Sequence, residues 1–161
     1  VAQGGDNVLK ALTKVEHDLR RVVDKEHIYK IDSKGNVKGP IIGEADKVDF
    51  TNLGTISKGD ILTHNHPSGS TFSREDIFNL AATEMTELRA VTLNKVYSVK
   101  KVGDFNYYYW YDNYLKLIEG FKVKYADKIR NGMTFEEQVL MQEELFAKSL
   151  EGYNVLFTIQ K

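Results

Sequence analysis

The chain has 161 residues, 42% of them hydrophobic, which suits one packed domain or one domain with an appendage. Its 22 basic and 23 acidic residues are spread without long blocks of one sign, which excludes a basic footprint for nucleic acid or an anionic membrane. It contains no cysteine, so disulfides and thiolate zinc sites are excluded and any metal ion must be bound by His, Asp or Glu.

The predicted organisation is a single domain over residues 1–161, with a core over 6–102 and a helical C-terminal extension over 104–161. No apolar run approaches the ~20 residues that a membrane span requires, and the amino end lacks the charged-then-apolar pattern of a signal peptide. We therefore expect a cytoplasmic protein. The chain opens with Val1 rather than Met, so an excised domain of a larger protein is the alternative.

The first part of the chain predicts one helix followed by strands. Apolar residues recur at helical spacing after Asp6, a good N-cap residue, and predict an amphipathic helix that ends near Asp24. The period then changes to that of strands, with a tight turn over residues 33–36 that indicates a hairpin. The predicted strands cover residues 27–32, 36–42, 47–50 and 60–66.

The rest of the chain predicts a helix, a hairpin, two long helices and a last strand. Ser73 and Asp76 form a capping-box pattern at the start of the first helix, whose apolar stripe continues through Met85 to Leu88. The elements after it are strands over 89–94 and 95–102, helices over 104–131 and 134–151, and a strand over 154–159. This order predicts an α/β fold with a mixed, mostly antiparallel sheet flanked by helices, extended by two C-terminal helices.

The first C-terminal helix begins with a run of aromatic residues, Tyr107-Tyr108-Tyr109-Trp110-Tyr111. Such a run suggests a platform on which nucleic-acid bases stack. Its continuation at helical spacing through Tyr114 and Phe121 instead favours helix packing, and the neutral chain offers no basic groove. We expect no nucleic-acid and no membrane partner, but an aromatic excess of this kind suits a protein partner or self-association.

The most informative segment is His64-Asn65-His66-Pro67-Ser68-Gly69, which holds two of the four histidines of the chain. An apolar run precedes it and a Pro-Ser-Gly turn lies within it, so both histidines are predicted at the end of a strand. At i, i+2 spacing a strand points two side chains to the same face. Two imidazoles, with a carboxylate from a following element, supply three zinc ligands and leave the fourth position to water, as in catalytic zinc sites.

This segment, with Ser73-x-x-Asp76 after it, resembles the JAMM/MPN metalloprotease superfamily. The likeness is to the HNHPSG version found in RadC-like proteins and in JAB-like domains of phage and polymorphic-toxin proteins. The family motif is a Glu well upstream, then His-x-His-Pro, then Ser-x-x-Asp. The resemblance covers residues 6–102 in the order of elements, with residues 64–76 as its specific part, and it implies a JAB/MPN-like, cytidine-deaminase-like fold.

The resemblance implies a zinc cofactor and assigns residues to it. Carried over residue by residue, it makes His64, His66 and Asp76 the zinc ligands, with water completing a tetrahedral site. Glu26, between the first predicted helix and the first predicted strand, would be the general base, and Glu44 is the reserve candidate.

The implied activity is that of a zinc metallopeptidase or isopeptidase, in which metal-activated water attacks an amide carbonyl of a protein or peptide substrate. Ser73 would donate a hydrogen bond to the developing oxyanion. The spacing from His66 to Ser73 is one residue shorter than is usual in the family, which motivates a second hypothesis, a catalytically inactive JAB-like domain for binding or assembly. A third, by analogy alone, is a toxin or effector domain of a phage or secreted protein.

Each assignment also has an explanation without chemistry. A His-x-His pair can end a polar strand with no metal, a capping box alone accounts for Ser73 and Asp76, and a single Glu after a helix is usually a solvated surface residue. We expect His17 and His27 to be ordinary surface or packing residues. The letters His-Asn-His do not indicate an HNH nuclease, because the residues of that motif are dispersed over a ββα-metal hairpin.

Overall fold

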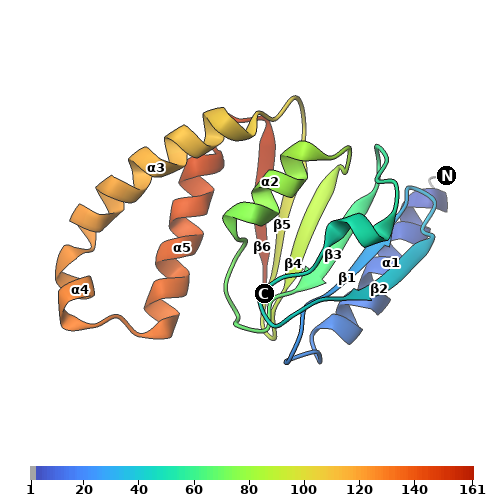
Figure 1. The fold of residues 1–161 in the computed structure, drawn as a ribbon, viewed down its shortest axis with the longest axis horizontal. Helices are drawn as coiled ribbons and strands as arrows, with labels where there is room; N and C mark the ends of the chain where they lie inside the picture. Colours follow the sequence, from blue (N-terminus) through green and yellow to red (C-terminus); the bar gives the residue numbers. More distant parts are fainter. Residues whose placement is uncertain (1–2) are drawn as a thin grey trace.

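The computed structural model describes residues 3–161. Its strands are β1 His27–Ile31, β2 Val37–Ile42, β3 Ile61–Asn65, β4 Glu87–Val91, β5 Val96–Lys101 and β6 Val155–Gln160. They form one sheet in the order β2-β1-β3-β4-β5-β6, with β3 and β4 parallel and every other neighbouring pair antiparallel. The predicted class, α/β with a mixed, mostly antiparallel sheet flanked by helices, is confirmed (Figure 1).

Successive strand residues point to opposite sides of the sheet, so both of its faces carry apolar side chains that pack against helices. The helices are α1 (Gln3–Leu19), the 3-10 helix η1 (Phe50–Leu53), α2 (Arg74–Ala82), α3 (Tyr107–Lys124), α4 (Ala126–Asn131) and α5 (Phe135–Leu150). Leu12, Val15 and Leu19 of α1 pack against one face. On the opposite face, η1 and α2 contribute the fully buried Leu53 and Ile77 to the larger core.

Helices α3 and α5 lie side by side and extend beyond β6 (Figure 1). Trp110 of α3 is fully buried, stacks on Phe146 of α5 and donates its indole N–H to Ser149 Oγ over 3.0 Å. The aromatic run therefore packs within the protein for the most part, as its helical spacing predicts. Tyr108 and Tyr109 are the exposed members, at 70% and 69%.

Replacing Trp110 with Phe is expected to lower the free energy of unfolding by about 1–3 kcal/mol, because it removes the indole hydrogen bond and leaves a gap beside Phe146. Trp110 and the sheet residue Leu88 belong to the same buried core, so one cooperative thermal transition should shift as a unit. Circular dichroism melting measures this shift, with the exposed Tyr108→Phe as the control. A separate, earlier loss of helix signal would show that α3 and α5 unfold independently of the sheet.

The first helix differs from the prediction at both ends. Gln3 is already helical, so Asp6 lies in the first turn rather than at the N-cap, where its charge still favours the helix dipole. The helix ends at Leu19 instead of near Asp24, because tighter hydrogen bonds follow it, such as the one from Val22 N to the Leu19 carbonyl.

Two other predicted elements are wrong. Residues 47–50 do not form a strand, and Asp49 instead caps η1 with its side chain. Helix α2 ends at Ala82, so the predicted stripe through Met85 and Leu88 is not helical, and Leu88 lies in β4. Met85 and Leu88 are nevertheless fully buried. Their spacing matched a helical face although one residue follows the helix and the other lies in a strand.

The C-terminal extension contains three helices rather than the predicted two, because the first is interrupted at Tyr125, between α3 and α4.

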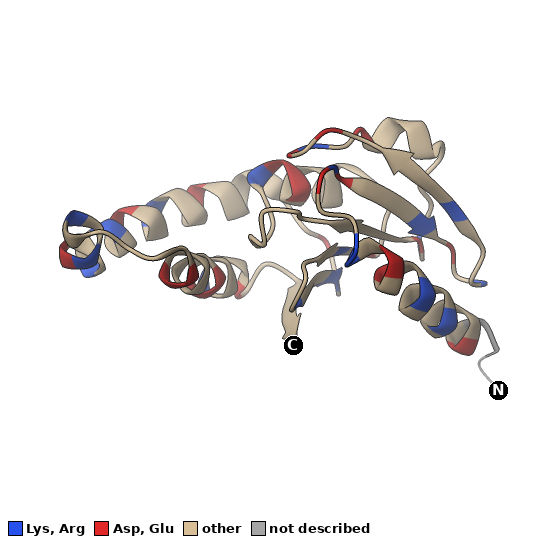
Figure 2. Ribbon diagram, turned by 90° about the horizontal axis from the view of Figure 1, so that it is seen from below, with Lys and Arg blue, Asp and Glu red and all other residues tan. Residues whose placement is uncertain are grey.

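Residues of both charge signs are interspersed along α1 and α3 (Figure 2). Within residues 3–161, none of the helices combines the length and the apolar character that crossing a membrane requires.

Candidate metal centre

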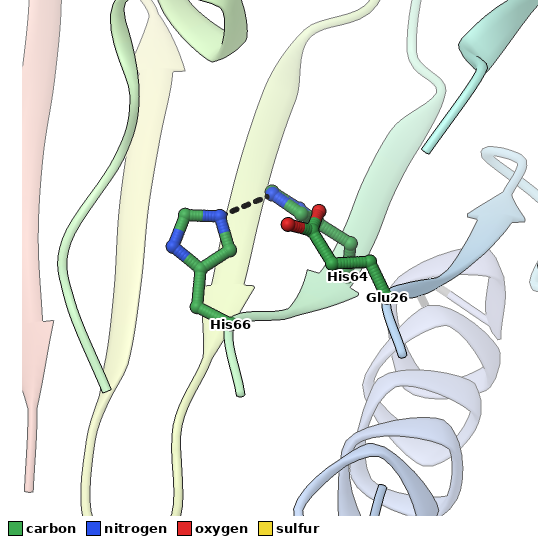
Figure 3. A group of neighbouring side chains, drawn as sticks. All are labelled: Glu26, His64 and His66. Carbon is green, nitrogen blue, oxygen red and sulfur yellow. Dashed lines mark hydrogen bonds between the residues drawn. The ribbon is translucent and has the colours of Figure 1, made fainter. Parts of the chain in front are cut away.

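Two histidines meet at the end of β3, in the middle of the sheet. His64 pairs with Ile28 of β1 and Ala90 of β4, and His66 follows the strand, donating its N–H to the Val91 carbonyl over 2.8 Å. Both side chains are buried. Their Nε2 atoms face each other at 2.9 Å (Figure 3). The i, i+2 spacing thus brings both imidazoles to one point.

The other ring nitrogen of each histidine is held by a backbone carbonyl. His64 Nδ1 lies 2.8 Å from Arg89 O, and His66 Nδ1 lies 3.0 Å from Ser70 O. A carbonyl only accepts, so each Nδ1 carries a proton, and in the neutral imidazole Nε2 then offers its lone pair. This is the tautomer that a metal ligand needs.

Asp76 brings a carboxylate to the same point from the first turn of α2. Its Oδ1 lies 3.4 Å from His64 Nε2, and its Oδ2 lies 3.2 Å from His66 Nε2. A capping box places it there: Ser73 Oγ accepts a hydrogen bond from Asp76 N over 3.1 Å, and Asp76 Oδ2 accepts one from Ser73 N over 3.0 Å. One carboxylate therefore caps the helix and also contacts both histidines.

Glu26 joins the group from the segment just before β1. It is 6% exposed, and its carboxylate lies beside the ring of His64 (Figure 3). The potential ligand atoms of Glu26, His64 and His66 all lie within 4.8 Å of one another. Two backbone hydrogen bonds of 2.7 Å hold Glu26, from its N–H to Glu44 O and from Gly43 N to its carbonyl. The reserve candidate Glu44 contributes only this backbone contact, since its side chain is 70% exposed.

The buried charges shift one another's pKa values. Burial raises the pKa of Glu26, and the two histidines partly offset that rise. Burial lowers the pKa of His66, but Asp76 and, more weakly, Glu26 outweigh it and raise the pKa to about 9. Burial by itself would raise the pKa of Asp76, yet the adjacent His64 and His66 hold it well below its usual range. The four side chains thus form one electrostatic unit.

The donor set fits a zinc ion. Ligand atoms bonded to zinc at ~2.0–2.1 Å in a tetrahedron lie roughly 3.3 Å from one another. The separations of 2.9 Å between the two Nε2 atoms, and of 3.2 and 3.4 Å from them to the Asp76 oxygens, are close to that value. Two imidazoles and a carboxylate also suit other first-row divalent ions. A metal ion therefore fits at this point, where Glu26, His64 and His66 each offer a ligand atom and the Asp76 carboxylate contacts both histidines.

A cleft of about 570 Å³ opens onto the group. Glu26, His66 and Asp76 line it, together with Ser73 and, from α5, Gln142. Ser73 is exposed, and a hydroxyl that accepts a hydrogen bond, as this one does from Asp76 N, retains its own proton to donate. The C-terminal extension also contributes to this cleft, which the helical pattern of α5 did not reveal.

Sequence reasoning missed Asn65, the residue between the two histidines. Its side chain is 1% exposed and lies on the opposite face of β3 from that of His64. There its amide hydrogen-bonds the segment that leads to Glu26. The available signal is an amide in a strand predicted to be buried, because buried polar side chains are almost always hydrogen-bonded to something specific.

Comparison with known proteins gives no match: no family model, no curated protein and no solved structure is similar enough to the chain to suggest what it does. The geometry of the site and the chemistry of its residues are therefore the grounds for assigning a function.

In chelator-treated protein, stability is expected to fall between about pH 6.5 and pH 9 through His66. Its pKa is raised to about 9 in the folded protein, so the folded state holds this proton more tightly than the unfolded chain. The stabilisation is complete below pH 6.5 and is lost as the pH rises through 9, an effect of up to about 3 kcal/mol. Urea unfolding of wild type and His66→Gln measures the free energy of unfolding of each. The difference between the two should become smaller as the pH rises. A constant difference would contradict the assignment.

Proposed function

We propose that the chain is a zinc-dependent peptidase or isopeptidase of the JAMM type, built on a JAB/MPN-like fold. The observation that carries the proposal is the convergence of His64, His66, Asp76 and Glu26 on one point, three of them lining the cleft beside it. They come from three separate parts of the chain. A His-x-His pair that merely ends a polar strand requires neither a buried carboxylate from a helix nor a second one from a distant segment.

Each residue has a role in amide hydrolysis. His64, His66 and Asp76 would hold a zinc ion, which would supply a Lewis acid to polarise a carbonyl and to lower the pKa of water toward ~7. Glu26 is suited to accept a proton from water in the cleft and return it to the leaving amine, and the raised pKa that burial gives it favours this exchange. Ser73, at the N-terminus of α2, is suited to donate a hydrogen bond to the developing oxyanion.

A binding or assembly domain that has lost its active site is the main competing function. It is motivated by the short spacing between His66 and Ser73. The shorter loop nevertheless closes onto the site, through a turn at Gly69, whose φ is 81°, and through the carbonyl of Ser70, which reaches His66 Nδ1. A scaffold without chemistry also has no need to bury this many ionisable groups at one point, because their desolvation is costly. The arrangement therefore favours the enzyme.

The test uses the full chain loaded with zinc and a mixture of short peptides joined through α-peptide or lysine ε-amide bonds. Mass spectrometry should find cleavage products that disappear with a chelator and return with added zinc. His64→Ala should lose both the products and the bound zinc. Zinc-loaded wild type that cleaves neither kind of bond would overturn the proposed activity, and wild type that binds no zinc would overturn the proposed cofactor.

A further inference from the structure

Asn65 joins the strand that carries the histidines to the segment that carries Glu26. Its Oδ1 accepts a hydrogen bond from His27 N over 2.6 Å, and its Nδ2 donates to the carbonyls of Val22 and Lys25, each over 2.8 Å. All three partners are backbone groups, and they lie on both sides of Glu26 in the sequence. A buried amide with three short hydrogen bonds holds such a segment in one place.

The segment between α1 and β1 has only turns and bends of its own, so its position depends on what it contacts. Gly43 and Glu44 bind the backbone of Glu26 from one side, and Asn65 binds the residues around it from β3. Because β3 alternates its side chains, His64 faces His66 and Asp76 while Asn65 faces this segment. Adjacent residues of one strand therefore fix a metal ligand and the location of the proposed base.

We propose that Asn65 is a positioning residue, which sets the location of the Glu26 carboxylate relative to the two histidines. The arrangement needs two N–H donors and one acceptor on a short side chain, and Asn alone offers that combination. The catalytic consequence rests on the proposed function. The structural consequence, the order of residues 22–27, does not.

The test compares Asn65→Ala with wild type in three measurements. Amide hydrogen exchange at His27, whose N–H binds Asn65, and at its neighbours should accelerate at least about tenfold. Peptide hydrolysis should fall by about 10- to 100-fold, while the zinc dissociation constant stays within about threefold of wild type. In a Glu26→Gln background, Asn65→Ala should cause no further fall in hydrolysis, because the residue it positions has already lost its function.

Two further variants separate positioning from general destabilisation. Asn113 also donates its amide to a backbone carbonyl, that of Ser149 over 3.1 Å, but within the C-terminal helices. Asn113→Ala should lower the melting temperature without changing the hydrolysis rate. Asn65→Asp keeps the acceptor for His27 N and loses both donors, so it serves where Asn65→Ala does not fold, and hydrolysis must still fall with zinc retained.

Equal losses of hydrolysis and zinc affinity in Asn65→Ala would overturn the proposal, since Asn65 would then support the ligands instead of the base. A further fall in the Glu26→Gln background would overturn it as well. If wild type binds zinc but hydrolyses no peptide, the proposed function fails alone. Hydrogen exchange then decides the positioning role: acceleration at residues 22–27 in Asn65→Ala upholds it, and unchanged exchange rejects it.

Discussion

Saturating zinc is expected to raise the melting temperature of the wild-type protein by about 8–16 °C and to leave a His64→Ala, His66→Ala double variant unchanged. A ligand at ~1,000 times its Kd stabilises the folded state by about 4 kcal/mol, and a chain of this length shifts by roughly 2–4 °C per kcal/mol. The double variant lacks both facing Nε2 atoms, so Asp76 remains without the nitrogen donors beside it. Calorimetric melting with and without zinc measures the effect, and elemental analysis gives the stoichiometry.

The matched control replaces the two other histidines, His17 and His27, with Ala. His17 is exposed on α1 and His27 is half-buried at the start of β1, and neither is predicted as a ligand. This control should keep the full zinc-dependent shift. A shift that survives in the His64, His66 variant, or that vanishes in the control, would place the metal ion elsewhere.

The proposed ligands can be predicted from the sequence because local geometry brings them together. The two-residue period of a strand brings His64 and His66 to one side, and a capping box fixes Asp76 at the third position of a helix. Only the path of residues 67–72 between these elements is left open. That path is short, so the carboxylate has few places to go.

Glu26 shows where local pattern stops being informative. Its approach to the histidines depends on β1 pairing with β3 in the register that sets Ile28 opposite His64, across many intervening residues. Such pairing reflects packing summed over the whole sheet, which no short window contains. Glu44 is the reserve candidate from the sequence, and the 70% exposure of its side chain in the folded protein is what separates it from Glu26.

Glu143, in the C-terminal extension, is a second residue whose contact in the fold cannot be predicted from local sequence. Glu143 lies at helical spacing from Val139 and Phe146, on the buried face of α5, and its carboxylate accepts a hydrogen bond from the Tyr97 hydroxyl in β5 over 2.9 Å. That contact fastens α5 to the sheet, and the preceding residue, Gln142, lines the cleft. Helical spacing predicts the existence of α5 and its apolar stripe. It does not predict which strand α5 contacts, because that depends on tertiary packing.

Glu26→Gln is expected to reduce peptide hydrolysis by about 10²- to 10⁴-fold, the usual contribution of a general base, while zinc still binds. Gln keeps the shape of the side chain but takes up no proton at neutral pH. His64, His66 and Asp76 are unaltered, so the zinc-dependent rise in melting temperature should persist. Steady-state rates and melting curves of the same zinc-loaded preparations measure both quantities.

The same variant separates a base from a ligand and from a structural residue. The carboxylate of Glu26 lies within 4.8 Å of both histidine nitrogens, so if it bound zinc directly the variant would lose zinc affinity together with rate. Burial raises the pKa of Glu26, which means that its ionised form destabilises the fold, and chelator-treated Glu26→Gln should be at least as stable as wild type. A group that weakens the fold and contributes only to rate is what an active site retains. A less stable, equally active variant would instead make Glu26 part of the framework.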